Sequence, residues 1–147
     1  MPDDPDLEIL LVEDNLKDLE LTVHALKKNR VANVVHVARD GQEALDFFFG
    51  PAARTGASLP KLVLLDLKLP KVNGIEVLRQ LKANPDTRAV PVVILTSSIE
   101  DKDMLDSYDL GVNSYLRKPI DFNEFVEVAR AIGLYWLLMN KTPRGDA

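Results

Sequence analysis

Short apolar runs, each followed at once by polar residues, constrain the fold of this chain more than any other feature of its sequence. Four of these runs cover residues 9–12, 62–65, 92–95 and 114–116. Short apolar runs between turn signals are typical of buried parallel strands, and a shorter strand is expected over residues 34–37. Segments with helical spacing separate the runs. This alternation predicts an α/β fold of the (βα)5 type, with a doubly wound, five-stranded parallel sheet and helices on both of its faces.

Five helices are expected between and after these strands. They cover roughly residues 16–29, 41–49, 75–84, 100–110 and 122–138. The first of them has an apolar face that is expected to pack on the sheet. That face carries Leu16, Leu19, Val23 and Leu26. Residues 50–60 are rich in Gly, Pro and small side chains, and they predict a loop that is longer than most connections in folds of this type.

The composition is that of one ordinary globular domain. The chain has 147 residues, of which 46% are hydrophobic and 28% charged, and no apolar stretch approaches the roughly 18 residues that a membrane span needs. The net charge of −5, without a cluster of Lys and Arg, argues against a nucleic-acid partner. The acidic N-terminus does not resemble a secretory signal, so a cytoplasmic location is expected. We expect one domain over residues 7–140, with disordered tails at residues 1–6 and 141–147.

Polar residues that follow the strand-like runs are expected to meet in one crevice, because ligands of open α/β sheets bind beyond the carboxyl ends of the strands. These residues are Glu13, Asp14, Asp66, Thr96, Lys118 and Pro119. Each of them alone is equally well a surface charge or a cap at a strand end. Their joint placement, with complementary chemistry at the end of several strands, indicates a functional site.

The three carboxylates of this set predict a metal site. Glu13, Asp14 and Asp66 would repel one another unless a cation neutralised them. Hard oxygen ligands suit Mg²⁺, which is usually held by one or two carboxylates and leaves room for water and a phosphate oxygen. The absence of cysteine excludes thiolate metal sites and disulfides. Magnesium is therefore the expected cofactor.

The remaining residues indicate that the site handles a phosphoryl group. Lys118 supplies a positive charge for it, while the Thr96 hydroxyl and the backbone N–H of Ser97 add hydrogen-bond donors. An aspartate carboxylate can act as the nucleophile that accepts a phosphoryl group. Asp66 is the best placed candidate for this role.

Several segments resemble the receiver domain of two-component response regulators, and the resemblance covers nearly the whole chain. They are ILLVEDN at 9–15, ARDGQEAL at 38–45, LLDLKLP at 64–70, Gly74, VILTS at 93–97 and YLRKP at 115–119. The resemblance implies a flavodoxin-like sheet of order 2-1-3-4-5. It also implies that Asp66 accepts phosphate from a sensor histidine kinase, and that the protein is a switch rather than an enzyme.

The resemblance further implies roles for the residues around Asp66. Asp14, Asp66 and the backbone carbonyl of Lys68 would bind Mg²⁺, and Glu13 would support the metal through water. Thr96 and Lys118 would hold the phosphoryl oxygens.

A conformational switch is implied as well. The Thr96 hydroxyl would move toward the phosphate and Tyr115 would turn inward, which changes the binding of a downstream partner protein. Simple packing at a strand end is the alternative role of Tyr115. The bond before Pro119 would be cis and would aim Lys118 into the site. Within the family, residues 107–115 and Trp136 look most like single-domain regulators paired with bacterial phytochromes, so a phytochrome is the expected kinase.

Two other functions remain alternatives at the level of sequence. A pseudo-receiver would serve as a scaffold without phosphorylation. A phosphatase of the haloacid dehalogenase type would use Asp66 as nucleophile, but it needs a second acid two residues later, where this chain has Lys68.

The end of the last expected helix changes character. Its solvent-facing side becomes apolar, and this predicts a surface that binds a second copy of the chain or another partner protein. The side chains of this surface are Leu134, Tyr135, Trp136 and Leu138. Core packing beneath the C-terminal tail is the alternative, and a symmetric dimer is the working hypothesis.

Overall fold

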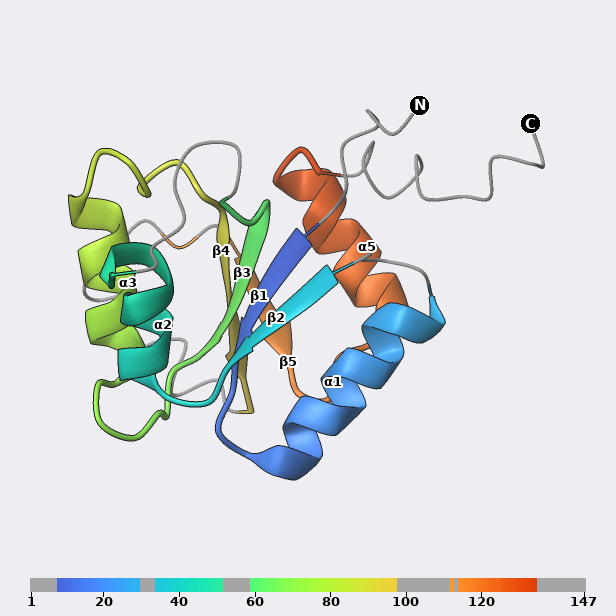
Figure 1. The fold of residues 1–147 in the computed structure, drawn as a ribbon. Helices are drawn as coiled ribbons and strands as arrows, with labels where there is room; N and C mark the ends of the chain where they lie inside the picture. The colour runs from blue at the N-terminus through green and yellow to red at the C-terminus, as the bar shows by residue number, and fades with distance from the viewer. Residues whose placement is uncertain (1–7, 30–33, 52–58, 98–111, 113, 135–147) are drawn as a thin grey trace.

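A parallel sheet of five strands forms the centre of the computed structural model, which describes residues 8–29, 34–51, 59–97, 112 and 114–134 (Figure 1). The strands are β1 (Glu8–Val12), β2 (Val34–Ala38), β3 (Leu62–Asp66), β4 (Val92–Thr96) and β5 (Ser114–Arg117). Their order across the sheet is β2-β1-β3-β4-β5, and every neighbouring pair is parallel. The expected fold class and sheet order are therefore confirmed.

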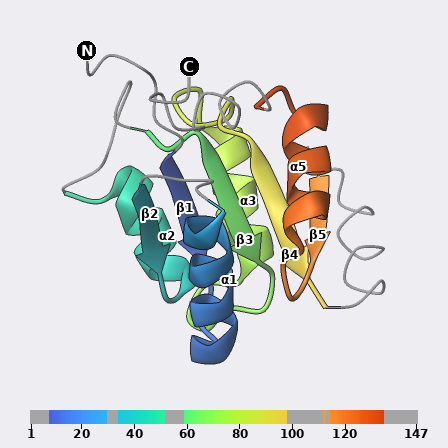
Figure 2. The same ribbon diagram turned by 90° about the vertical axis from the view of Figure 1, so that its right-hand side faces the viewer.

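Helices cover both faces of the sheet. One face carries α1 (Leu16–Lys28) and α5 (Phe122–Ala131), which lie in front of the sheet in Figure 2. The other carries α2 (Gly41–Phe49) and α3 (Gly74–Ala83), on the left of Figure 1. The helix expected over residues 100–110 lies outside the described residues. No helix of the described part is long and apolar enough to cross a membrane.

Alternate strand residues enter two separate cores. In β1, Leu10 and Val12 belong to the core beneath α2 and α3, whereas Ile9 and Leu11 belong to the core beneath α1 and α5. All four side chains are fully buried. Successive side chains of a strand point to opposite faces, and both faces are covered here. The continuous apolar runs of the sequence are thus explained without any polar alternation.

An Asn or Asp precedes each described helix and caps it. The cap side chain accepts the backbone N–H of the residue three positions later, at 2.8–3.1 Å. The cap pairs are Asn15 with Asp18, Asp40 with Glu43, Asn73 with Glu76, and Asp121 with Glu124. Such caps satisfy N–H groups that have no partner within the helix. They fix where each helix starts after the preceding strand.

Two expectations for the helices are wrong in detail. Leu16 does not belong to the buried face of α1, because it occupies the first helical position and is 56% exposed. Thr22 is buried on that face beside Leu19 and Leu26. The start of α1 lies at the end of the sheet, where a side chain one turn before Leu19 has no strand to pack on.

The last described helix ends earlier than expected, at Ala131 rather than near residue 138. Gly133 has φ of 85°, its N–H donates to the Arg130 carbonyl at 3.2 Å, and the N–H of Leu134 donates to the Ala129 carbonyl at 2.8 Å. This pair of hydrogen bonds is the Schellman motif, which terminates helices at a left-handed Gly. The apolar line expected to continue along one helix is therefore interrupted at Gly133.

Candidate functional site

The carboxyl ends of four adjacent strands bring the predicted site residues together, at the lower edge of the sheet in Figure 1. Glu13 and Asp14 directly follow β1, Asp66 ends β3, Thr96 ends β4, and Lys118 directly follows β5. The order of the strands makes these ends neighbours. Residues up to 105 positions apart in the chain thus meet at this edge of the sheet.

Three carboxylates cluster there. Oxygens of Glu13, Asp14 and Asp66 all lie within 4.8 Å of one another. Glu13 is fully buried and Asp66 is 6% exposed. Carboxylate oxygens at this separation are the donor set that a hard divalent cation prefers. The residues present therefore fit Mg²⁺.

Lys118 neutralises part of this negative charge. Its Nζ donates to Glu13 Oε1 at 3.1 Å, to Asp66 Oδ2 at 3.0 Å and to Asp18 Oδ2 at 3.0 Å. An ammonium group has three N–H donors, so these three contacts account for all of them. The Lys118 side chain is only 14% exposed, and this burial strengthens its ion pairs.

Asp18 is the one residue of this network that the sequence did not reveal as part of the site. It lies in the first turn of α1, and its contact with Lys118 joins residues 100 positions apart. The sequence held no clear signal for this role, because Asp18 does not follow a strand-like run and lies within the first expected helix. Acids are common in the first turn of a helix, where they favour the helix dipole.

The charges and the burial of the site shift the pKa values of Glu13 and Lys118. Burial raises the pKa of Glu13 to about 7, and the hydrogen bond and negative charge of Asp66 act in the same direction. Burial lowers the pKa of Lys118, but hydrogen bonds to Asp66 and Asp18 and the charge of Asp66 outweigh it and leave that pKa raised. Lys118 is therefore a permanent cation, whereas Glu13 carries its charge only in part at neutral pH.

Thr96 and Ser97 lie at the end of β4. Thr96 is buried and stands opposite Arg117 in the β4–β5 register, and its carbonyl accepts the backbone N–H of Lys118 at 2.9 Å. Ser97 follows the strand and is exposed. The peptide bond between Lys118 and Pro119 is cis. Backbone pairing between β4 and β5 thus positions the residue from which the lysine side chain extends into the site.

The turn after β3 packs tightly under Asp66. The N–H of Lys68 donates to Asp66 Oδ1 at 3.1 Å, and the N–H of Gly74 donates to the Leu67 carbonyl at 2.9 Å. A Cβ on Gly74 would lie 2.4 Å from the Asp66 carbonyl oxygen, so only glycine fits. The role of the Lys68 carbonyl as a metal ligand stays a prediction.

The remaining sequence candidates pack against one of the two cores or lie outside the described residues. Tyr115 is half-buried, stands opposite Ile94 and packs against the core beneath α2 and α3. Leu134 packs against the core beneath α1 and α5. The other residues of the expected interface, Tyr135, Trp136 and Leu138, lie outside the described part of the chain.

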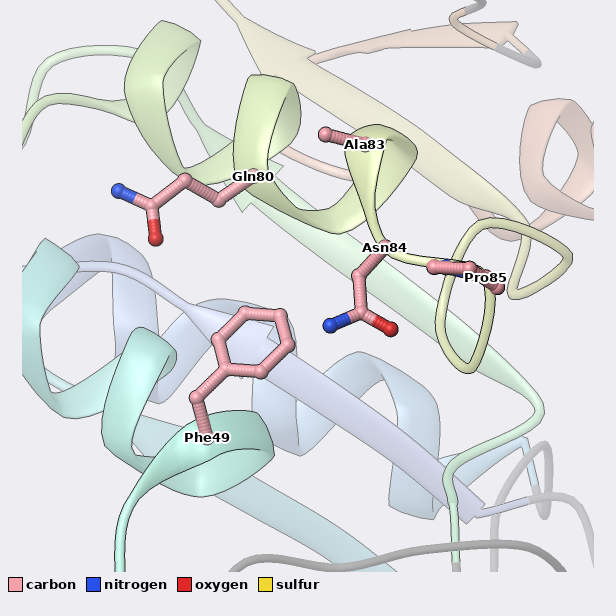
Figure 3. Close-up of a pocket in the computed structure, with 5 residues that line it drawn as sticks. All are labelled: Phe49, Gln80, Ala83, Asn84 and Pro85. Carbon is pink, nitrogen blue, oxygen red and sulfur yellow. The ribbon is translucent and has the colours of Figure 1, made fainter.

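A surface hollow of about 300 Å³ lies elsewhere, between the ends of α2 and α3. Phe49 faces Gln80 and Asn84 across it in Figure 3. Helices that connect parallel strands run opposite to them, so the ends of α2 and α3 lie at the amino edge of the sheet. The five residues that line the hollow include no charged side chain. The hollow is therefore separate from the acidic site.

Comparison with known proteins identifies the family. Residues 9–130 match the family model of the response regulator receiver domain. The chain belongs to this family. Receiver domains of response regulators are phosphoacceptor switches and not enzymes in their own right, and the acidic site described above occupies the carboxyl edge of this receiver domain.

Three proteins of known name are similar to this receiver domain over most of their length. It is 44% identical to the probable methanogenesis regulatory protein FilR2 of Methanothrix harundinacea, over 92% of this chain and 86% of that protein. It is 38% identical to the response regulator Rcp1 of Synechocystis sp., over 90% of each chain. It is 49% identical to the solved bacteriophytochrome response regulator AtBRR, with a TM-score of 0.79 over 90% of this chain and 96% of that one.

A further solved structure concerns the metal. It is the Mn(2+)-bound form of Rcp1, with a TM-score of 0.67, 38% identity, and coverage of 90% of this chain and 95% of that one. These matches confirm the expected family and its likeness to phytochrome-associated regulators. They span most of each relative, so the likeness concerns the whole receiver domain.

Proposed function

We propose that this receiver domain accepts a phosphoryl group on Asp66 from a sensor histidine kinase, in the presence of Mg²⁺, and that phosphorylation changes its binding to a partner protein. One observation supports this most strongly. Asp66 Oδ2 lies 3.0 Å from the ammonium of Lys118, inside a cluster of carboxylates that fits a divalent cation. A carboxylate with a cation on one side and a metal site on the other is arranged to attack a phosphorus atom.

In the proposed step, an oxygen of Asp66 forms a bond to the phosphorus atom while the bond from phosphorus to the donor breaks. The donor leaves with the bonding electrons, as the imidazole of a phosphohistidine or as acetate when acetyl phosphate is used. Lys118 would stabilise the negative charge on the transferred group. The Thr96 hydroxyl and the backbone N–H of Ser97 are proposed as further donors to it, since β4 ends beside β3.

Mg²⁺ would be held by Asp14 and Asp66, with Glu13 beside it and the Lys68 carbonyl as a further ligand. Bound there, it would neutralise charge on the carboxylates and on the phosphoryl oxygens. The clustered oxygens of this chain and the Mn(2+)-bound form of Rcp1 support this assignment. Lys118 would then be released from part of its pairing with the carboxylates.

The output is proposed to pass through Thr96 and Tyr115. Thr96 is buried at the end of β4, next to the strand that carries Tyr115. A shift of the Thr96 hydroxyl toward a phosphoryl group would open space that the half-buried Tyr115 could fill. The likeness to AtBRR supports a bacterial phytochrome as the kinase. Dimerisation, the downstream partner and the cytoplasmic location remain predictions from the sequence.

The experiment that tests this function is an intact-mass measurement after incubation with MgCl₂ and acetyl phosphate. The wild-type protein is expected to gain one phosphoryl group, and Asp66→Asn none. Asp86→Asn serves as the matched control, because Asp86 is an exposed aspartate on the turn after α3, and it should behave as wild type. Folded wild-type protein that gains no adduct would overturn the proposal and favour the scaffold function.

A further inference from the structure

The ion pair between Asp18 and Lys118 points to a function that the metal cluster does not explain. Three carboxylates of the described chain bind Lys118, and two of them, Glu13 and Asp66, also belong to the candidate metal cluster. Asp18 does not belong to that cluster. It is held in place by the start of α1, where its backbone N–H donates to Asn15 Oδ1 at 2.9 Å.

In α2 and α3, the acid at the equivalent position contacts groups of its own helix or of the residues just before it. Glu43 accepts the backbone N–H of Arg39 at 2.9 Å, just before α2 begins. Glu76 binds Arg79 at 2.7 Å and Gln80 at 3.0 Å, both within α3. The Asp18 carboxylate instead contacts a lysine that follows β5. Its contact therefore reaches beyond its own helix.

We propose that Asp18 is a positioning residue for phosphoryl transfer, which holds the Lys118 ammonium beside Asp66 while Glu13 and Asp66 engage the metal and the phosphoryl group. This inference rests on the proposed function. Lysine is a point charge on a flexible four-carbon stem, so its place must be set by its partners. Once Glu13 and Asp66 face other ligands, Asp18 is the partner that can keep Lys118 in position.

Positioning differs from a simple contribution of negative charge, and two substitutions separate the two effects. Asp18→Asn removes the charge but keeps a carbonyl oxygen that can accept a hydrogen bond from Lys118. Asp18→Ala removes both. The matched control is Glu124→Ala, because Glu124 is an exposed acid at the same position of α5. It tests the loss of an acid from a helix start.

Two quantities are measured for each variant. One is the rate at which the phosphoryl adduct accumulates from acetyl phosphate at saturating Mg²⁺, and the other is the dissociation constant of Mg²⁺ by calorimetry. Asp18→Ala is expected to lower the rate about tenfold, since small misplacements of a reacting group are costly, while Asp18→Asn stays within about threefold of wild type. Both substitutions of Asp18 should raise the dissociation constant of Mg²⁺ to the same extent. Glu124→Ala should change neither quantity.

A double-mutant cycle with Lys118→Ala provides a readout that needs neither metal nor phosphoryl donor. In urea unfolding without Mg²⁺, the effects of Asp18→Ala and Lys118→Ala should not add, because each removes the same ion pair. In the rate assay, Asp18→Ala should have no further effect once Lys118 is absent. Additive effects in both assays would show that Asp18 acts without Lys118, and would overturn the proposal.

The outcomes also separate this inference from the proposed function. A wild-type protein without any adduct would overturn both. Normal phosphorylation of the wild type, with equal rates for Asp18→Asn and Asp18→Ala, would overturn the positioning role alone and leave Asp18 as a source of negative charge. An Asp18→Asn variant that keeps the rate, while Asp18→Ala loses it, would establish the inference.

Discussion

Replacing Glu13 with Gln should stabilise the protein, and the gain should appear only as the pH rises. Glu13 is fully buried, and its carboxylate faces the charge of Asp66. Burial first, and Asp66 second, make ionisation of Glu13 unfavourable in the folded protein. Gln has nearly the same shape, and its one amide oxygen can still accept from Lys118, which donates to Glu13 Oε1 at 3.1 Å. The N–H of Asn15, which donates to Glu13 Oε2 at 3.2 Å, then faces the amide nitrogen, and this loss is the same at every pH. Gln cannot ionise, so it avoids the unfavourable charge.

The magnitude follows from the pKa of Glu13, which is about 7 in the folded protein against an ordinary value of 4.5. Each pKa unit is worth about 1.4 kcal/mol, so full ionisation lowers the free energy of unfolding by roughly 3 kcal/mol. Between these pKa values the folded protein binds more protons than the unfolded chain, and stability falls as pH rises. The contribution of the protonated acid is fully present below pH 4.5 and lost above about pH 7.

The assay is urea unfolding of wild type and Glu13→Gln at pH 4.5, 6, 7 and 8 without divalent metal. Between pH 4.5 and pH 8, the difference in unfolding free energy should shift by about 2–3 kcal/mol in favour of the variant. Glu20→Gln, an exposed acid of α1, is the control and should change stability by less than about 0.5 kcal/mol throughout. A difference that is constant with pH, or a variant that loses stability as pH rises, would refute the reasoning.

Three further predictions concern the metal, the turn under Asp66 and the core. Mg²⁺ should raise the melting temperature of wild type, more at pH 8 than at pH 5.5, and EDTA should reverse the effect. Gly74→Ala should lower the unfolding free energy by roughly 2–4 kcal/mol and slow phosphorylation of Asp66, because its Cβ would lie 2.4 Å from the Asp66 carbonyl oxygen. Phe125→Ala should lower the free energy of unfolding by about 3–5 kcal/mol, since Phe125 is 1% exposed. Urea unfolding measures this free energy for both variants. The control is Phe122→Ala, whose side chain is exposed at the start of α5, and it should lower the free energy of unfolding by less than about 1 kcal/mol.

The sheet could be predicted from the sequence because its strands are buried on both faces. Runs such as residues 62–65 contain only Leu and Val, and a parallel strand between two helical layers needs no polar alternation. The site residues Asp66 and Thr96 could be placed for the same reason, since each ends such a run. All strands of a parallel sheet end at the same edge, so residues that directly follow these strands come together there.

Features that depend on distant pairing or on local backbone conformation were harder to predict. Asp18 looks like an ordinary acid of a first helical turn until β5 brings Lys118 within 3.0 Å of it. The end of α5 was misplaced because helical spacing continues through Leu134, whereas Gly133 adopts a left-handed conformation that stops the helix. Lys71 also has a positive φ of 68°. Its side chain type offers no warning of this, because lysine seldom adopts that conformation.

The charge balance of the site connects its stability to its proposed function. Glu13, Asp18 and Asp66 bind the ammonium of Lys118, and Asp14 lies in the cluster with Glu13 and Asp66. Among these five described residues, four acids therefore stand against one ammonium, which leaves an excess of negative charge without a metal. That excess opposes folding, and the fully buried strands on either side of the site must offset it. The same excess favours a divalent cation, since binding it relieves repulsion that the folded protein already contains. A variant that removes the repulsion, such as Glu13→Gln, should therefore gain stability and lose affinity for Mg²⁺ together.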